Sequence, residues 1–186
     1  MILIYHKNKT NYKMRKKKYR TIVVDPPWKY KDKLPPKHGR VPYSVMTMSQ
    51  LKLLPVSKLA DKNCHLYLWT TNAFIREAFQ LLEAWGFQYK TMITWIKPNM
   101  LGLGYYWRNN TEHCLFAVKG KKNVKRHDIW NVIIAPRRKH SEKPVEFMCL
   151  VEEMSPGPRL EMFSRNKRRG WHVWGNEVKS DVVLPV

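Results

Sequence analysis

Four consecutive residues combine groups that could hold a flat, amino-bearing ligand: Asp25, Pro26, Pro27 and Trp28. They follow Thr21–Val24, an apolar, β-branched run that is typical of a buried strand, and two successive prolines must end such a strand. The prolines fix the φ angles and remove two backbone donors, so the turn is stiff. We therefore expect a carboxylate, rigid carbonyls and an indole at the carboxyl end of a strand, where open α/β sheets bind ligands.

The chemistry that suits these groups is the activation of an exocyclic amine on a planar base. The carboxylate of Asp25 and the carbonyl of Pro26 could accept its two hydrogens, which would localise a lone pair otherwise delocalised into the ring. Charge-assisted hydrogen bonds of this kind are stronger than neutral ones. Trp28 or Tyr43 would stack on the base, an interaction worth about 1–3 kcal/mol. Taken alone, Asp25 is equally compatible with an ordinary turn aspartate before prolines.

The rest of the sequence predicts the elements that must position this loop. Further strands are expected at residues 65–69, 91–96, 114–118, 132–135, 160–163 and 172–174. Helices are expected at 48–59, interrupted near Pro55, at 72–85, capped by Asn72 and stopped by Gly86, and at 141–154, with Ser141 as N-cap. Strands that alternate with helices predict an α/β protein with a doubly wound sheet.

Length and charge predict one domain that binds a polyanion. The 186 residues fit a single domain at 20–186, preceded by a basic segment at 1–19. The chain has 35 Lys and Arg residues but only 14 Asp and Glu residues, so its net charge is +21. Nucleic acid is the commonest partner of such a basic protein. The predicted phosphate contacts are Lys16, Lys17, Lys121, Lys122 and Arg126. The N-terminal cluster is equally compatible with a solvated tail.

Several classes of protein do not fit the sequence. Cys64, Cys114 and Cys149 are far apart and are predicted to be buried, reduced thiols. Without a C-x-x-C or H-E-x-x-H motif, no metal site is expected. No apolar run approaches the roughly 18 residues that span a bilayer, so no membrane association is expected. These features indicate a cytoplasmic protein, or a nuclear one if the source is a eukaryote.

Short motifs along the whole chain occur in an order typical of one family. They are Asp25–Trp28, Pro42-Tyr43, Leu68-Trp69, Thr94–Lys97, Glu112–Leu115 with Val118–Gly120, His140–Pro144, Ser155–Gly157, Glu161–Arg165 and Trp174–Asn176. The chain resembles the S-adenosylmethionine-dependent adenine N(6)-methyltransferases that include the catalytic subunit of the eukaryotic messenger-RNA methyltransferase. That family also has DNA-modifying, bacterial and phage members. The resemblance runs from about Thr21 to Val178.

The resemblance implies a Rossmann-like class I methyltransferase fold, with a mostly parallel sheet. It also implies a circularly permuted motif order, because Lys143-Pro144 and the strand ending at Phe163 look like cofactor-site pieces yet follow the catalytic loop. The implied reaction is direct, in-line transfer of a methyl group from S-adenosylmethionine to an adenine that is flipped out of a duplex or unpaired. The catalytic residues would be those of Asp25–Trp28.

The same resemblance assigns cofactor and substrate contacts. Lys143 would bind the methionine end of the cofactor, with Asp25 beside it. Arg165, Asn176 and Glu177 would contact the ribose hydroxyls or lie beside them. Glu112 would line the pocket that receives the base.

The sequence also departs from the family pattern. An acidic residue that reads the cofactor's adenine in the messenger-RNA enzymes is missing, because the region around Lys7–Asn11 is basic. Lys167 and Glu177 stand where that pattern has a histidine and a glutamine. RNA-binding zinc fingers and a separate base-reading domain are absent, which favours DNA over RNA as the substrate. An RNA adenosine methyltransferase and a catalytically silent, nucleic-acid-binding subunit stay open as alternatives, as do a homodimer and a heterodimer.

Overall fold

The computed structural model describes residues 17–30, 44–99, 102, 106–121, 123–137 and 142–185. In this part of the chain, seven strands form one sheet in the order β5-β3-β4-β2-β1-β6-β7. The strands are β1 (Tyr19–Val24), β2 (Ala60–Thr70), β3 (Gln88–Ile96), β4 (Thr111–Lys119), β5 (Val132–Ile134), β6 (Arg159–Met162) and β7 (Trp171–Trp174). The helices are α1 (Met48–Leu53), α2 (Val56–Leu59), the 3-10 helix η2 (Asn72–Phe74), α3 (Ile75–Ala84) and α4 (Val145–Met154).

Strand direction confirms the predicted α/β architecture with a mostly parallel sheet. Strand β1 is parallel to β2 and β6, β7 is parallel to β6, and β5 is parallel to β3. Strand β4 is antiparallel to both of its neighbours, β2 and β3. We call the edge where the parallel strands end and β4 begins the carboxyl edge, and the other one the amino edge.

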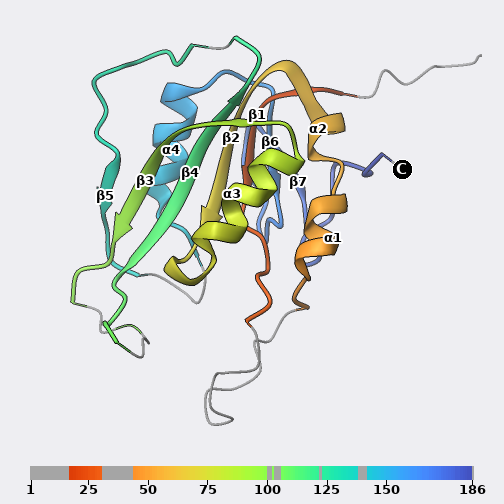
Figure 1. Ribbon diagram of the computed structural model, residues 1–186. Helices are drawn as coiled ribbons and strands as arrows, with labels where there is room; N and C mark the ends of the chain where they lie inside the picture. Colours follow the sequence, from red (N-terminus) through yellow and green to blue (C-terminus); the bar gives the residue numbers. More distant parts are fainter. Residues whose placement is uncertain are drawn as a thin grey trace, which may run out of the picture.

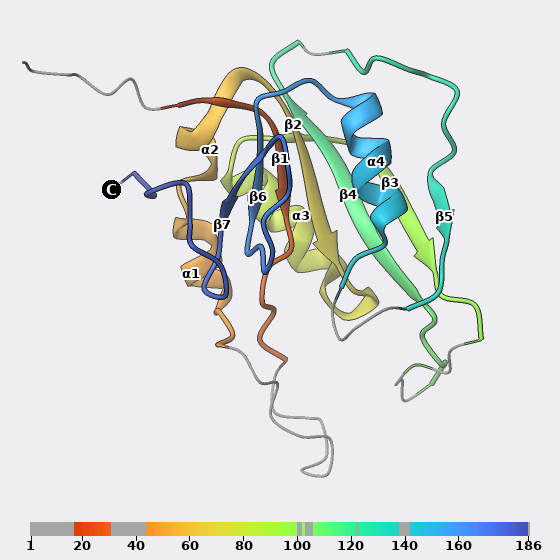
Figure 2. The ribbon, with the colours of Figure 1, turned by 180° about the vertical axis from the view of Figure 1, so that it is seen from behind.

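Helices cover both faces of the sheet. Helices α1, α2 and α3 lie on one face and α4 on the other, as the two opposite views show (Figures 1 and 2). Successive residues of β1 therefore face different cores: Ile22 belongs to the cluster under α1–α3, whereas Val23 packs with Phe147 of α4. The two hydrophobic clusters fix the sheet, and with it the positions of the loops at its carboxyl edge.

The amphipathic helix that the sequence predicts after β2 is present, but its cap is a different residue. The sequence predicts Phe74, Ala78, Leu81, Leu82 and Trp85 on its core face. The last four are at most 2% exposed, whereas Phe74 precedes the helix and is only half-buried, and Gly86 ends the helix at φ 73°. The predicted N-cap, Asn72, is wrong. Residues 72–74 form a 3-10 turn, Phe74 occupies the cap position of α3, and the Asn72 amide bonds to side chains of β4 instead.

The predicted start of the last helix at residue 141 is also wrong. Residue 141 lies outside the described residues, but residues 142–144 are not helical and α4 begins at Val145. Pro144 is the extended N-cap and has no side-chain capping bond. A proline disfavours helical geometry in the residue before it, so Lys143 lies in the loop that precedes α4.

Other details modify the expectations from the sequence. Tyr19, predicted to belong to the N-terminal segment, is the first residue of β1 and is 1% exposed. Cys64 and Cys114 are buried free thiols, but Cys149 is exposed, so its predicted burial is wrong. In the described part of the chain no helix has the length and apolarity needed to cross a membrane. No cluster of three or more potential metal ligands occurs among the described residues.

Candidate active site

The loop after β1 is held by its own backbone. Pro26 O accepts a hydrogen bond from Trp28 N at 2.9 Å, and Pro27 O accepts one from Met46 N at 2.9 Å. The predicted turn therefore ends β1 at the expected place and presents Asp25 at the carboxyl edge. One lone pair of Pro26 O is already used, so its predicted role as an acceptor for a base amine depends on the other.

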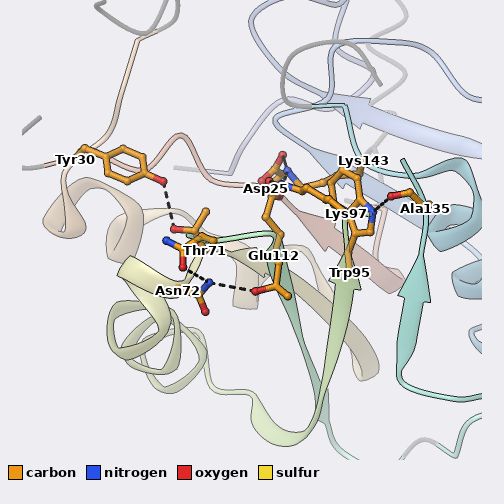
Figure 3. Close-up of polar contacts among 11 residues, drawn as sticks. Asp25, Tyr30, Thr71, Asn72, Trp95, Lys97, Glu112, Ala135 and Lys143 are labelled. Carbon is orange, nitrogen blue, oxygen red and sulfur yellow. Dashed lines mark hydrogen bonds and ion pairs between the residues drawn. The ribbon is translucent and has the colours of Figure 1, made fainter. Parts of the chain in front are cut away.

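Four charged side chains meet at the carboxyl edge (Figure 3). Lys143 Nζ donates to Asp25 Oδ2 at 2.6 Å and lies 3.4 Å from Glu112 Oε2. Glu112, the second residue of β4, also accepts a hydrogen bond from Lys97, which directly follows β3. Two ammonium groups therefore balance two carboxylates, and the chain of contacts runs from Lys97 to Asp25. The predicted residues Asp25, Lys143 and Glu112 are brought together.

The charged groups and their burial shift the pKa values of Asp25, Glu112 and Lys143. Burial raises the pKa of Asp25, an effect that Lys143 partly opposes. Burial by itself would raise the pKa of Glu112, but Lys143 and Lys97 outweigh it and lower that pKa. Burial would likewise lower the pKa of Lys143, yet the two carboxylates raise it. Lys143 therefore stays an ammonium, while Asp25 is a better proton acceptor than an ordinary aspartate.

Two tryptophans form the floor under the ammonium groups. Lys97 Nζ lies 4.5 Å from the ring centroid of Trp95, and Lys143 Nζ lies 5.2 Å from that of Trp69. Trp95 Nε1 donates to Ala135 O at 2.8 Å, which fixes the ring (Figure 3). Cations over indole faces at these distances are attracted to the ring, so the floor helps to hold both ammonium groups in place.

Trp28 is placed differently from the expectation that it stands free beside a base. It is 6% exposed, and its ring stacks on Phe74 at 5.1 Å with an interplanar angle of 11°. One face of the indole is thus occupied by the protein, and the visible role of Trp28 is to pack the loop onto the core. Base stacking by Trp28 stays a prediction. Tyr43, the other predicted stacking residue, lies outside the described residues.

The predicted ribose contacts lie at the same edge, after β6 and β7. Arg165 Nε and Glu177 Oε1 form an ion pair at 3.3 Å, and Asn176 is exposed beside them. Gly175 packs directly on Ser164, because a Cβ on this glycine would come 2.1 Å from Ser164 O. The ends of β6 and β7 therefore approach each other more closely than any larger residue at 175 would allow.

We expect Gly175→Ala to destabilise the fold by about 1–3 kcal/mol, the usual cost of overpacking. The added methyl group would collide with backbone atoms, which cannot rotate away as a flexible side chain could. Urea denaturation measures the loss. Gly86→Ala is the matched control, because a Cβ there meets nothing within 4 Å and only the positive φ is unfavourable. Equal losses in the two variants would contradict this account.

The predicted phosphate contacts are not beside Asp25. Lys17 precedes β1, Lys121 follows β4, and both therefore lie at the amino edge. The seven residue steps from Glu112 to the end of β4 place this edge about 24 Å from Glu112. Arg126 is near the end of α4 and is paired with Asp128 and Glu153 at 2.7 Å. The structure therefore separates these residues from the site, and Lys16 and Lys122 lie outside the described residues.

Several residues at the site were not singled out from the sequence. Lys97 is one, although it belongs to the charged quartet formed by Asp25, Lys143, Glu112 and Lys97. Glu161 on β6 is another. Burial raises the pKa of Glu161, opposed by Ser164, and the charge of Asp25 raises it further. Three exposed basic residues at the carboxyl edge were also missed: Lys29, Arg108 and Arg137. Only the position of each residue relative to a strand end could have indicated them.

Glu112 should make the stability depend on pH. Because its pKa is lowered in the fold, its contribution is present above the pKa of a glutamate in the unfolded chain. The contribution is lost as the pH falls through the lowered native pKa. We expect Glu112→Gln to lose less unfolding free energy than wild type as the pH is lowered, measured by urea denaturation at several pH values. Glu83→Gln, on the exposed part of α3, controls for net charge. If Glu112→Gln loses unfolding free energy in acid as steeply as wild type, Glu112 is not the group responsible.

The sequence was also compared with known proteins. A sequence description of the MT-A70 family matches residues 19–177. The N(6)-adenosine-methyltransferase MT-A70-like of Arabidopsis thaliana is 32% identical over 84% of this chain and 23% of its own. The human N(6)-adenosine-methyltransferase catalytic subunit METTL3 is 31% identical over 87% of this chain and 28% of its own. The type II methyltransferase M.MunI of a Mycoplasma species is 29% identical over 90% of this chain and 81% of its own.

The chain thus spans about a quarter of the length of the plant and human relatives, but most of the length of the bacterial one. The matched region, 19–177, includes all four charged residues of the site as well as Arg165, Asn176 and Glu177. The chain belongs to the MT-A70 family.

Proposed function

We propose that this protein transfers a methyl group from S-adenosylmethionine to the exocyclic amino group of adenine in nucleic acid. One observation carries the proposal. The Asp25 carboxylate stands at the end of β1 in a stiff Pro-Pro turn, and Lys143 holds it at 2.6 Å. A fixed, ionised acceptor at the ligand-binding edge of an α/β sheet is what activation of a weakly nucleophilic amine needs.

The residues at the carboxyl edge fit S-adenosylmethionine chemically. Lys143 offers an ammonium for the cofactor's carboxylate, while Asp25 and Glu161 offer carboxylates for its amino group and its sulfonium. Arg165, Asn176 and Glu177 offer polar groups for ribose hydroxyls. The close backbone approach of Gly175 to Ser164 brings the ends of β6 and β7 together beside these groups. When bound, the cofactor supplies a methyl group on a positively charged sulfur.

The chain's own residues would orient the base and take up its proton. Asp25 accepts one hydrogen of the amine and so localises the nitrogen lone pair towards the methyl donor. Its pKa, raised by burial, suits it to accept the proton that the amine loses. Glu112 and Lys97 hold Lys143 against Asp25, and the indole floor of Trp69 and Trp95 excludes water from below. Orientation of this kind can save about 7–11 kcal/mol of a barrier.

DNA is the favoured substrate in this proposal. Its support is the likeness to the bacterial type II methyltransferase M.MunI, which is 29% identical over 90% of this chain. Exposed Lys29, Arg108 and Arg137 at the carboxyl edge supply cations for phosphates near the target base. The amino-edge residues Lys17 and Lys121 could then reach only more distant phosphates of a longer substrate.

The test is mass spectrometry of nucleosides after incubation with S-adenosylmethionine and single- or double-stranded DNA or RNA. N(6)-methyladenine in DNA would support the proposal, and methylation of RNA alone would reverse the substrate preference. A catalytically silent binding subunit would methylate none of the four. In that case thermal denaturation with and without cofactor separates an enzyme lacking its substrate, which is stabilised, from a binding module, which is not.

A further inference from the structure

A pair of aromatic side chains stands almost fully in solvent beside the candidate active site. Tyr106 is 97% exposed and Trp107 is 85% exposed, in the segment between β3 and β4. Neither ring contributes to the two hydrophobic cores. Single exposed apolar residues are ordinary, but adjacent exposed ones often mark a surface that binds a ligand.

The segment that carries these rings is hydrogen-bonded to the rest of the fold next to the rings. Asn110 O accepts a hydrogen bond from Lys97 N at 2.8 Å, and Asn72 Nδ2 donates to Asn109 Oδ1 at 3.3 Å. Gly102 packs so closely on Asn109 that a Cβ there would lie 1.8 Å from Asn109 O. The residues that follow the rings, Asn109 and Asn110, are therefore fixed by hydrogen bonds. Lys97 connects them directly to Glu112.

The rings also lie on the correct edge of the sheet for a substrate. Trp107 precedes Glu112 by five residues, so even a fully extended chain would separate the two by only about 17 Å. A nucleic acid with its target adenine at Asp25 would extend several nucleotides across this distance. Trp130 makes a useful contrast: it is also 85% exposed, but it lies outside this segment, before the outermost strand β5 and level with the middle of β3, where Asn131 Nδ2 donates to Met92 O.

We propose that Tyr106 and Trp107 form a stacking platform for unpaired bases next to the target adenine. Arg108 follows the two rings directly, and Lys29 and Arg137 lie at the same edge of the sheet, so cations share this edge with the platform. This favours a polyanion that carries flat apolar faces over a protein partner. It also disfavours a second copy of this chain, because each copy carries a net charge of +21.

The platform would help to meet the cost of extracting the base. Flipping an adenine out of a duplex costs a few kcal/mol, because its neighbours lose their stacking partner. Aromatic side chains that receive those neighbours replace part of that stacking without reading their identity. This inference rests on the proposed function, since it assigns the platform to the nucleotides beside the methylated base.

Fluorescence of 2-aminopurine, placed next to the target adenine in a DNA oligonucleotide, tests the platform by binding alone. In wild type, stacking on an aromatic ring should quench the probe at saturation. Trp107→Ala should weaken binding between about 5-fold and 150-fold, the range for stacking on one base, and should reduce the quenching. Trp107→Phe should restore most of both effects. Trp130→Ala, an equally exposed tryptophan outside the segment between β3 and β4, should bind as wild type does.

The other outcomes distinguish failure of the platform from failure of the proposed function. If Trp107→Ala and the double variant Tyr106→Ala/Trp107→Ala bind and methylate DNA as wild type does, the rings are not a platform. If these variants change only the molar mass in light scattering, the rings belong to a protein interface. If the variants lose binding but the wild type methylates no nucleic acid, the platform stands and the proposed reaction fails.

Discussion

Asp25→Asn should lower the rate of methyl transfer by at least about a thousandfold and leave the chain folded. The amide keeps the shape of the carboxylate but loses its charge, so it is a weak acceptor for the amine hydrogen and cannot take the proton. The fold should tolerate the change because burial disfavours the ionised form of Asp25, and Lys143 keeps Glu112 as a partner.

The measurement is single-turnover methylation of an adenine-containing oligonucleotide, with thermal denaturation of the same preparations. Asp128→Asn is the matched control, because Asp128 is a 69% exposed aspartate paired with Arg126 far from the site. It should methylate at the wild-type rate. Activity of Asp25→Asn within about tenfold of wild type would show that another group activates the amine.

Local sequence signals predicted much of this fold because they depend on neighbouring residues. The prolines after Val24 end β1 where expected, Pro55 divides the segment 48–59 into two helices, and Gly86 ends α3. Asn72 shows the limit of such signals. Its amide could cap a helix, but once β4 lies beside it, His113 and Thr111 are better partners.

The quartet could be predicted only in part. The family resemblance indicated Asp25, Lys143 and Glu112, but not that Lys97 would join them. Its place depends on the pairing of β3 with β4, in which Trp95 lies opposite Glu112, so that Lys97, two residues after Trp95, can reach the carboxylate. This register arises from the packed sheet and has no marker in the local sequence.

The charge of the chain predicts a polyanionic ligand but does not indicate where it would bind. Basic runs are conspicuous in the sequence, so Lys17, Lys121 and Arg126 were the natural candidates. The direction of β1 and β4 puts the first two at the amino edge, and Arg126 pairs with acidic residues near the end of α4. Isolated cations such as Lys29 and Arg108 are less conspicuous, yet strand direction brings them to the site.

Lys143→Met should have the largest effect on stability, a loss of about 3 kcal/mol. Removing one partner of a buried ion pair costs about 3–5 kcal/mol, and the lower end applies because the Asp25 side chain is 36% exposed. Lys143 is only 16% exposed and serves two carboxylates, of which Glu112 keeps Lys97. Lys167→Met, at an exposed pair with Asp181, is the control and should cost at most about 1 kcal/mol.

A double variant separates the structural role of Lys143 from its role towards the cofactor. Asp25→Asn/Lys143→Met leaves no unpaired charge at Asp25, so it should be more stable than Lys143→Met alone, with an interaction energy visible in urea denaturation. Stabilisation by S-adenosylmethionine in thermal denaturation should stay absent from both, because neither offers an ammonium to the cofactor's carboxylate. Additive stabilities would mean that the Asp25–Lys143 contact contributes nothing to the fold. Cofactor binding by the double variant would assign the carboxylate to another cation.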